Sequence, residues 1–176
     1  MKLIFVIFSF FIFCFSQKDN FPLSFNTKDK SMENKTHSIN RIINTNSDRV
    51  FKVVSDFKNY EKWNSIIPSA KGEFKEGARL NFRMKIDNKI KPFKPKVISI
   101  KKGESFTVSK IIISKGVGEL THHFEFKSLA PDKMEFIQTW TGKGWLVKMM
   151  WPKISKLFPD FEIFTDDLVK YLEKTE

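Results

Sequence analysis

The sequence contains a single cysteine, Cys14, among its 176 residues. A lone thiol cannot form an intramolecular disulfide, and it cannot build a metal site that depends on several cysteines. No His/Glu pattern with metal-ligand spacing, no phosphate-binding Gly-rich loop and no Gly-x-Ser-x-Gly nucleophile motif is present. The pair Gly116-x-Gly118 lacks the third glycine of a dinucleotide site. The sequence therefore predicts no metal, no cofactor and no nucleotide-dependent activity.

No apolar run reaches the roughly 20 residues that a membrane-spanning helix needs. The longest run covers residues 3–15, follows the positive charge of Lys2, and ends in a polar segment at residue 17. Cys14 and Ser16 place small residues at the minus-three and minus-one positions of a cleavage site. We expect residues 1–16 to be a signal peptide for export, secreted or periplasmic. The alternatives are an uncleaved anchor and a lipid anchor on Cys14, although Phe13 is bulky for a lipoprotein signal.

Acidic residues are in the minority: 20 Asp and Glu face 31 Lys and Arg, which gives a net charge of +11. Such an excess suits an anionic membrane surface, nucleic acid or an acidic partner, but it also accompanies any composition rich in Lys, Asn, Ile and Phe. The lysines are spread along the chain, and no nucleic-acid motif accompanies the basic and aromatic residues at 89–102. We therefore expect no nucleic-acid partner and keep an anionic membrane surface as a possibility.

Residues 17–36 are polar without periodicity and are predicted to be a flexible leader. The twenty Phe residues of the whole chain exceed what a disordered chain could leave in water, so we expect one folded domain at residues 37–176. Asn46 and Ser47 can cap a helix over residues 48–55, and Asp56 can cap a short helical turn. Asp160 can cap a final helix, and residues 143–158 are interpreted as a mobile, partly helical lead-in. Alternating apolar residues predict an antiparallel meander with strands at 38–44, 80–86, 97–100, 105–113, 119–126 and 134–141.

This order of elements resembles the SRPBCC or START-like helix-grip superfamily. That group includes START-like lipid-transfer domains, the major birch pollen allergen and the polyketide cyclase/dehydrase group. The resemblance covers residues 37–173 and rests on the opening motif at 46–51 and 56–67, on a glycine pair, and on His122-x-Phe124, Trp140-x-Gly142 and Phe161-x-x-Phe164-x-x-x-Leu168. It implies an α+β helix-grip fold: a curved antiparallel sheet wrapped around a long C-terminal helix, with two short helices after the first strand.

The sequence departs from the family at one position. Members often carry a glutamate four residues before the glycine that corresponds to Gly142, and this chain has Gln138 there. The exchange removes an ionisable group from the face that the resemblance assigns to a cavity. It therefore weakens any inference of acid–base chemistry.

His122 is the main candidate for chemistry, because strand alternation places it on the inward face with Phe124. It could orient or protonate a ligand, or it could be a core histidine satisfied by Gln138. A buried Gln138 amide needs a partner, which could be His122, water or a ligand. The full set of predicted ligand-binding residues is Phe82, Met84, His122, Phe136, Gln138, Trp140, Phe161 and Phe164. Met149, Met150 and Trp151 could form a flap over the cavity or a membrane-touching patch.

Three functions remain open, and the first is favoured. The protein could be an exported binding protein that holds a hydrophobic small molecule such as a lipid, isoprenoid or polyketide-like compound. It could be an enzyme resembling a polyketide cyclase/dehydrase, with His122 as its only catalytic candidate. It could instead be an interaction protein whose cavity is filled by side chains and whose basic surface meets a membrane or partner.

Overall fold

The computed structural model of the chain describes residues 34–86 and 88–175. The signal peptide predicted at residues 1–16, with its possible lipid anchor at Cys14, lies outside these residues, as does most of the predicted leader. Strand β1 (Lys35–Ile43) begins two residues before the expected domain boundary. Lys35 and Thr36 pair with Gly142 and Thr141 of strand β8 (Lys133–Lys143), so these two leader residues belong to the sheet.

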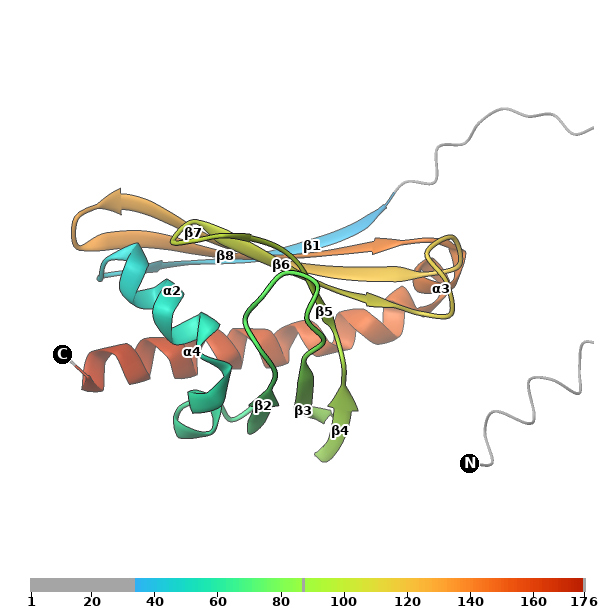
Figure 1. The fold of residues 1–176 in the computed structure, drawn as a ribbon, viewed down its shortest axis with the longest axis horizontal. Coiled ribbons are helices and arrows are strands. Elements are labelled where there is room, and N and C mark those ends of the chain that lie inside the picture. Colours follow the sequence, from blue (N-terminus) through green and yellow to red (C-terminus); the bar gives the residue numbers. More distant parts are fainter. Residues whose placement is uncertain (1–33, 87, 176) are drawn as a thin grey trace, which may run out of the picture. The chain divides into compact units, whose positions relative to one another are not determined.

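Five antiparallel strands form the main sheet in the order β1-β8-β7-β6-β5 (Figure 1). The remaining bounds are β5 Lys96–Lys101, β6 Ser105–Ile111 and β7 Glu119–Ala130. Consecutive strands are joined by short turns, as the predicted meander requires. Along β8 the inward side chains are Met134, Phe136, Gln138 and Trp140, all buried, which confirms the alternation expected from the sequence.

A second, three-stranded sheet contains β2 (Ser69–Lys71), β3 (Asn81–Ile86) and β4 (Lys89–Phe93) in that order. The prediction of a single sheet was wrong, and β2 and β4 were not expected. Pro92 lies in β4, which is an edge strand and can therefore spare the N–H that proline lacks. Two backbone hydrogen bonds connect the sheets: the Leu80 N–H donates to Pro95 O at 2.8 Å, and the Val97 N–H donates to Ala78 O at 2.9 Å.

Two short helices follow β1, as predicted: α2 (Ser47–Ser55) and the 3-10 helix η1 (Phe57–Lys62). Asn46 caps α2, since its side-chain oxygen accepts a hydrogen bond from the Arg49 N–H at 2.8 Å. The capping role expected of Asp56 is not observed. Its carboxylate instead accepts a hydrogen bond from the Asn59 side chain at 2.6 Å.

The C-terminal helical run is longer than expected. Helix α3 (Trp145–Ile154), a 3-10 turn η2 (Ser155–Leu157) and helix α4 (Phe158–Lys174) follow one another without a gap. Pro152 lies in the last turn of α3 and does not end the helical run there. Asp160 is not the cap of α4, because the helix begins at Phe158; Asp160 lies in its first turn, where a negative charge suits the helix dipole.

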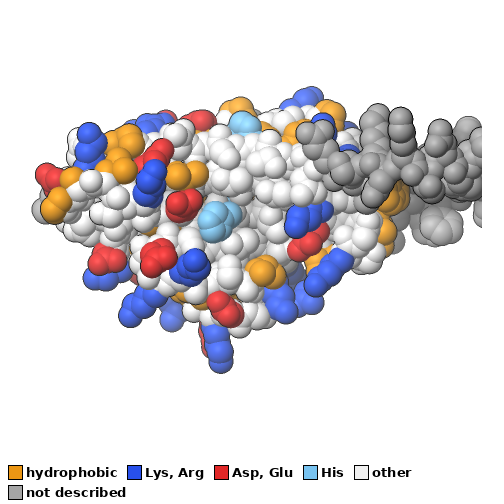
Figure 2. All heavy atoms as spheres, turned by 90° about the horizontal axis from the view of Figure 1, so that it is seen from above, with side chains coloured by type: hydrophobic (Ala, Val, Ile, Leu, Met, Phe, Trp, Pro, Cys, Tyr) orange, Lys and Arg blue, Asp and Glu red, His pale blue; other side chains and the backbone are white. Residues whose placement is uncertain are grey.

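The core lies between the main sheet and α4, which runs beneath it (Figure 1). Phe164, Leu168 and Leu172 form the buried stripe of α4, and Val50 and Val54 of α2 are fully buried beside them. The predicted α+β architecture, a curved antiparallel sheet held against a long C-terminal helix, is confirmed. Figure 2 looks onto the outer face of this sheet, where basic and acidic side chains are interspersed. In the described part of the chain, no helix combines the length and apolar character needed to cross a bilayer.

Candidate functional site

The inward faces of β7 and β8 place His122 beside Gln138. In the sheet register His122 pairs with Trp140 and Phe124 pairs with Gln138, so the two polar side chains are diagonal neighbours on one face. His122 Nε2 lies 3.2 Å from Gln138 Oε1. The partner that the sequence suggested for the histidine is therefore confirmed.

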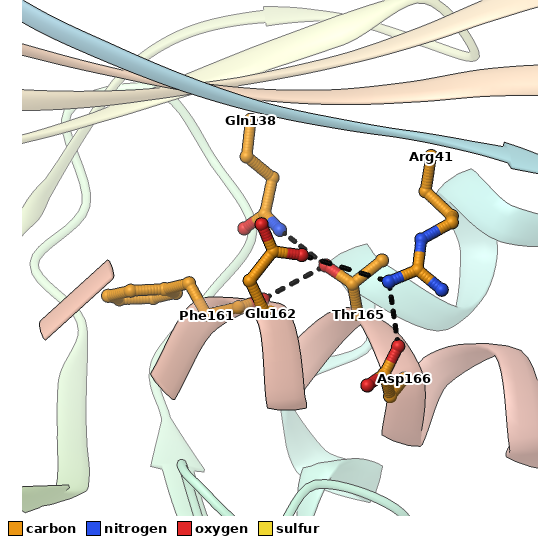
Figure 3. Close-up of polar contacts among 6 residues, drawn as sticks. All are labelled: Arg41, Gln138, Phe161, Glu162, Thr165 and Asp166. Atoms are coloured by element: carbon orange, nitrogen blue, oxygen red, sulfur yellow. Dashed lines mark hydrogen bonds and ion pairs between the residues drawn. The ribbon is translucent and has the colours of Figure 1, made fainter. Parts of the chain in front are cut away.

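The contact continues from the sheet into helix α4. Gln138 is fully buried, and its amide Nε2 donates to Thr165 Oγ1 at 2.9 Å. The Thr165 hydroxyl donates in turn to the backbone carbonyl of Phe161 at 2.9 Å. Figure 3 shows Gln138 reaching down from the sheet to Thr165, with the ring of Phe161 turned to the other side. We call His122, Gln138 and Thr165 the polar chain.

The order of donors in the polar chain fixes the histidine tautomer. Because the Thr165 hydroxyl donates its proton to Phe161 O, it accepts from the NH₂ group of Gln138. The amide oxygen of Gln138 therefore faces His122 and accepts, so the proton of the neutral imidazole lies on Nε2. The other ring nitrogen, Nδ1, is then a hydrogen-bond acceptor.

Aromatic rings surround His122. Its ring centroid lies 4.2 Å from that of Trp140, 3.9 Å from that of Phe124 and 5.3 Å from that of Phe161. Burial in these surroundings holds the pKa of His122 well below its usual value; the hydrogen bond to Gln138 acts in the opposite direction, and the charge of His123 adds to the lowering. His122 is therefore neutral at physiological pH, which agrees with the single proton assigned above.

The neutral histidine predicts a pH dependence of stability. In the unfolded chain a histidine takes up a proton as the pH falls below about 6.5, whereas folded His122 does not. Folding therefore loses stability as the pH falls through this range, at up to about 1.4 kcal/mol per pH unit. Urea unfolding between about pH 5 and 7.5 should show this loss in the wild type and a weaker one in His122→Asn.

The matched control is His123→Asn, which removes the neighbouring histidine on the outer face, where its ring contacts Thr107 Oγ1. This variant should retain the contribution of His122. Equal pH dependence in the wild type and His122→Asn would show that His122 is protonated in the folded state.

A cavity of about 80 Å³ lies where β3, β4, β6, β7 and the α3–α4 junction meet. Its lining is apolar except for His122, Ser109 and Lys110. The lining residues are Met84, Ile86, Phe93, Pro95, Val108, Ser109, Lys110, Leu120, His122, Trp140, Ile154, Leu157, Phe158 and Phe161. The volume exceeds the roughly 10–15 Å³ that one water requires, and it is well below the roughly 300 Å³ of the smallest typical ligand pockets.

A second cavity of about 20 Å³ lies deeper, towards η1 and the middle of α4. Five residues line both spaces, so they form the wall between them: Met84, Phe93, Val108, His122 and Phe161. The sequence left open whether the Phe side chains fill the cavity, and twelve of the twenty lie in residues 37–176. The rings fill most of the interior and leave one small cavity with a narrow extension.

Six of the eight predicted ligand-binding residues line these spaces. Met84, His122 and Phe161 line both, Trp140 lines the first cavity, and Phe82 and Phe164 line the second. Phe136 and Gln138 line neither: Phe136 packs between Phe124 and Phe126 in the core, and Gln138 is enclosed within the polar chain. We assign Gln138 the role of positioning His122.

Sequence analysis missed the residues that come from β4 and from the start of the C-terminal helical run. Phe93 lies in a segment where prolines argued against a strand, and Ile154 and Leu157 lie in the segment interpreted as a mobile lead-in. Of the expected flap, Met149 is exposed, whereas Met150 and Trp151 pack partly against the core. The helical spacing of Val147, Ile154 and Phe158 was the available signal, since all three are buried.

Ionisable groups are scarce around the cavity. Among the described residues, Lys110 and His122 are the only ionisable ones in its lining, and nearby Glu119 accepts a hydrogen bond from Ser109 Oγ at 2.7 Å. In residues 34–86 and 88–175, no three His, Cys, Asp or Glu side chains gather closely enough to hold a metal ion. The cavity can therefore enclose an apolar group and offer it one neutral imidazole.

No family model matches the sequence, and no curated protein matches it. Solved structures do match the fold. A START superfamily protein from Mycobacterium smegmatis superposes with a TM-score of 0.62 at 14% identity, covering 80% of this chain and 99% of that one. The Zhui aromatase/cyclase from a Streptomyces species gives 0.66 at 9% identity, covering 81% and 95%. This chain has the START-like helix-grip fold.

A third match with the START-like fold is a truncated norcoclaurine synthase from Thalictrum flavum, with a TM-score of 0.63 at 14% identity, covering 80% of this chain and 94% of that one. The resemblance drawn from the sequence motifs is thus confirmed at the level of the fold. The likeness spans between 94% and 99% of each of these three structures. At these identities the likeness establishes the fold alone, so the ligand must be inferred from the residues that line the cavity.

Proposed function

We propose that the protein is an exported binding protein that holds a small hydrophobic molecule in the first cavity. The observation that carries this proposal is the apolar lining closed around one neutral histidine. Apolar burial at about 25 cal/mol per Å² supplies affinity, and the histidine sets orientation. Export rests on the apolar run at residues 3–15, and the START-like fold is compatible with a bound small molecule.

The tautomer of His122 selects among hydrophobic molecules. Because Nε2 donates to Gln138, the nitrogen left for a ligand is Nδ1, which accepts. A hydroxyl, phenol or amine N–H of the ligand can donate to it. A ketone, which only accepts, cannot donate to Nδ1 and leaves it unsatisfied, at a cost of about 1–3 kcal/mol for a buried group. The preferred ligand is therefore an apolar molecule with one hydrogen-bond donor.

The size of the cavity limits what binds without rearrangement. About 80 Å³ accommodates a group of a few heavy atoms, since a ring the size of benzene binds in cavities of about 150 Å³. A larger ligand must displace the wall between the two cavities. Met84 is the side chain in that wall best suited to move, because methionine is unbranched and adapts its shape.

The test is binding of the neutral fluorescent probe phenylnaphthylamine, which carries one N–H donor, to the chain from Gln17 onward. The probe is larger than the first cavity, so its binding also requires the wall between the two cavities to move. Leu120→Trp fills the first cavity from strand β7 and should weaken probe binding at least tenfold. Leu129→Trp is the matched control, because Leu129 lies on the same strand, is 45% exposed and lines neither cavity. Native mass spectrometry of protein purified from its own host should show an extra mass that denaturation removes.

Two results would contradict the proposal. One is the absence of both a native ligand mass and probe binding, which would favour the filled-core interaction protein. The other is equal probe binding by the wild type and Leu120→Trp, with both folded by circular dichroism. That outcome would place the probe on the surface of the protein.

An enzyme resembling a cyclase is the second candidate, because His122 lines both cavities and one matching structure is an aromatase/cyclase. Neutral His122 could accept a proton at Nδ1 as a general base. Its partner Gln138 is not ionisable, so the imidazolium that forms lacks a carboxylate to stabilise it. His122→Asn separates the candidates: an enzyme loses turnover of the identified ligand, whereas a binding protein changes only its affinity.

A further inference from the structure

The end of the domain at which β8 leads into α3 exposes three large apolar side chains. Ile113 is 83% exposed, Met149 66% and Trp145 57%, and Ile113 and Met149 are among the most exposed large apolar residues described. Ile113 comes from the β6–β7 loop, and Trp145 and Met149 come from α3. The loop and the helix lie side by side (Figure 1), and the Leu146 N–H of α3 donates to Val117 O of the loop at 3.1 Å. We call this surface the α3 end.

The backbone at the tip of the β6–β7 loop is strained. Ile113 has a φ of +69°, in the left-handed region that β-branched residues rarely occupy. Such a conformation costs on the order of 1–3 kcal/mol, and it persists where function requires it. Here the strain holds the most exposed apolar side chain of the surface out into solvent, where it contributes nothing to the core.

The charges around these side chains are mostly positive. Residues 136–159 contain four lysines and no acidic residue. Residues 105–118 contain two lysines and also no acidic residue. The six lysines of the α3 end are Lys110, Lys115, Lys143, Lys148, Lys153 and Lys156. Two carboxylates border these segments: Glu119, which accepts a hydrogen bond from Ser109, and Asp160 in the first turn of α4. The outer face of the sheet, in contrast, mixes both signs (Figure 2).

Helix α3 has one buried side and one side exposed to solvent. Val147 and Ile154 are buried against the domain. At about 100° per residue, Trp145, Met149 and Lys153 lie on the opposite side, which faces water. An exposed helix face with a tryptophan, a methionine and lysines is the composition of helices that lie in a membrane interface.

We propose that the α3 end docks the protein on an anionic lipid bilayer. Trp145 suits the interface because its ring is apolar and its N–H is polar, and Ile113 and Met149 reach the acyl boundary. The lysines extend apolar stems beside them and place their ammonium groups among anionic headgroups. The same segment supplies Ile154, Leu157 and Phe158 to the first cavity, so docking brings the cavity wall next to the bilayer.

The test measures co-sedimentation of the chain from Gln17 onward with vesicles of phosphatidylcholine, with and without about one third phosphatidylglycerol. Every described core residue lies between Ile39 and Leu172, so this chain retains the whole core. We expect binding to the anionic vesicles alone, and weaker binding as salt shortens the screening length from about 10 Å. Ligand binding plays no part in this measurement.

Two variants and their controls locate the contact. Lys115→Gln/Lys153→Gln/Lys156→Gln should reduce the partition coefficient 10- to 100-fold, since each lysine near such a surface contributes roughly fivefold. Trp145→Ser/Met149→Ser should reduce it at least tenfold. The controls remove equal charge and similar apolar area at the opposite end of the sheet: Lys101→Gln/Lys102→Gln/Lys133→Gln and Ile42→Ser/Leu129→Ser. All four variants avoid the residues that line the two cavities, so probe binding should persist in each.

Brominated lipids supply a readout of insertion. They should quench tryptophan fluorescence in the wild type and less in Trp145→Phe. The proposal is overturned if anionic vesicles do not bind the wild type, if the two lysine variants lose equal affinity, or if Trp145→Ser/Met149→Ser binds as the wild type does. Loss of probe binding with intact vesicle binding would instead count against the proposed function alone.

Discussion

Gly144→Ala is expected to lower the free energy of unfolding by about 3 kcal/mol or more. Gly144 precedes α3 with φ +85° and ψ 158°, a conformation that glycine alone adopts readily. A Cβ at this position would lie 2.5 Å from Val117 O and 2.7 Å from Val117 C. Both are backbone atoms of the β6–β7 loop, so no side-chain rotation relieves the overlap.

The matched control is Gly116→Ala in the same loop. A Cβ on Gly116 meets no atom within 4 Å, and its φ is not in the left-handed region. This variant should stay within about 0.5 kcal/mol of the wild type. Thermal unfolding by circular dichroism should then place Gly144→Ala on the order of 10 °C below Gly116→Ala. Equal melting temperatures would mean that the loop and α3 do not meet as described.

Gln138→Leu is expected to destabilise the fold by about 2–3 kcal/mol, although it makes the core more apolar. Leucine fills a similar volume but leaves the His122 N–H without its acceptor, beside the ring of Trp140. The Thr165 hydroxyl still donates to Phe161 O, but it loses the Gln138 amide N–H that donates to it. Urea unfolding at constant pH measures the change.

A double-mutant cycle with Thr165→Val shows whether the polar chain acts as a unit. The two substitutions together should cost less than the sum of each, with a coupling of about 1 kcal/mol or more, because each orphans the partner of the other. Thr139→Val is the control: Thr139 is next to Gln138 in sequence but contacts Ser38 Oγ on the outer face. Additive effects of Gln138→Leu and Thr165→Val on the free energy of unfolding would show that the polar chain does not act as a unit.

Strand alternation was enough to predict much of this site. The period of two along β7 and β8 put His122 and Gln138 on one face, and the antiparallel order made them neighbours. The apolar spacing of α4 likewise identified Phe161, Phe164, Leu168 and Leu172 as buried. These features depend on local pattern and burial, which sequence expresses directly.

The missed features depend on tertiary context. Thr165 completes the polar chain, yet a threonine on a helix carries no signal that a glutamine of a strand will reach it. Pro92 argued against a strand, and only the edge position of β4 makes it tolerable. Residues 145–157 form helix in spite of Pro152 because Val147 and Ile154 are buried against the domain. The volume of the cavity follows from how rings interlock, which composition does not determine.

The polar ties of α4 are distributed unevenly along its length. Arg49 Nη2 donates to Leu172 O at 2.7 Å, and Asp167 accepts from the Ser65 N–H and hydroxyl at 2.9 and 2.6 Å. Arg41 Nη2 lies 2.8 Å from Asp166 Oδ1 and farther, at 3.7 Å, from Glu162 Oε2 (Figure 3). The first turn of α4, at Phe158 and Phe161, is held by aromatic contacts.

Hydrogen bonds and an ion pair therefore hold the C-terminal half of α4 to the rest of the domain. Apolar contacts near Phe158 lack the strict geometry of hydrogen bonds, so they separate and re-form without orphaning a polar group. Displacement of the first turn near Phe158 would widen the cavity without breaking the hydrogen bonds of Asp167 and Arg49. The hydrogen bonds to Asp167 and Leu172 thus lie away from the cavity, and the end of α4 that lines the cavity is the end held by apolar contacts.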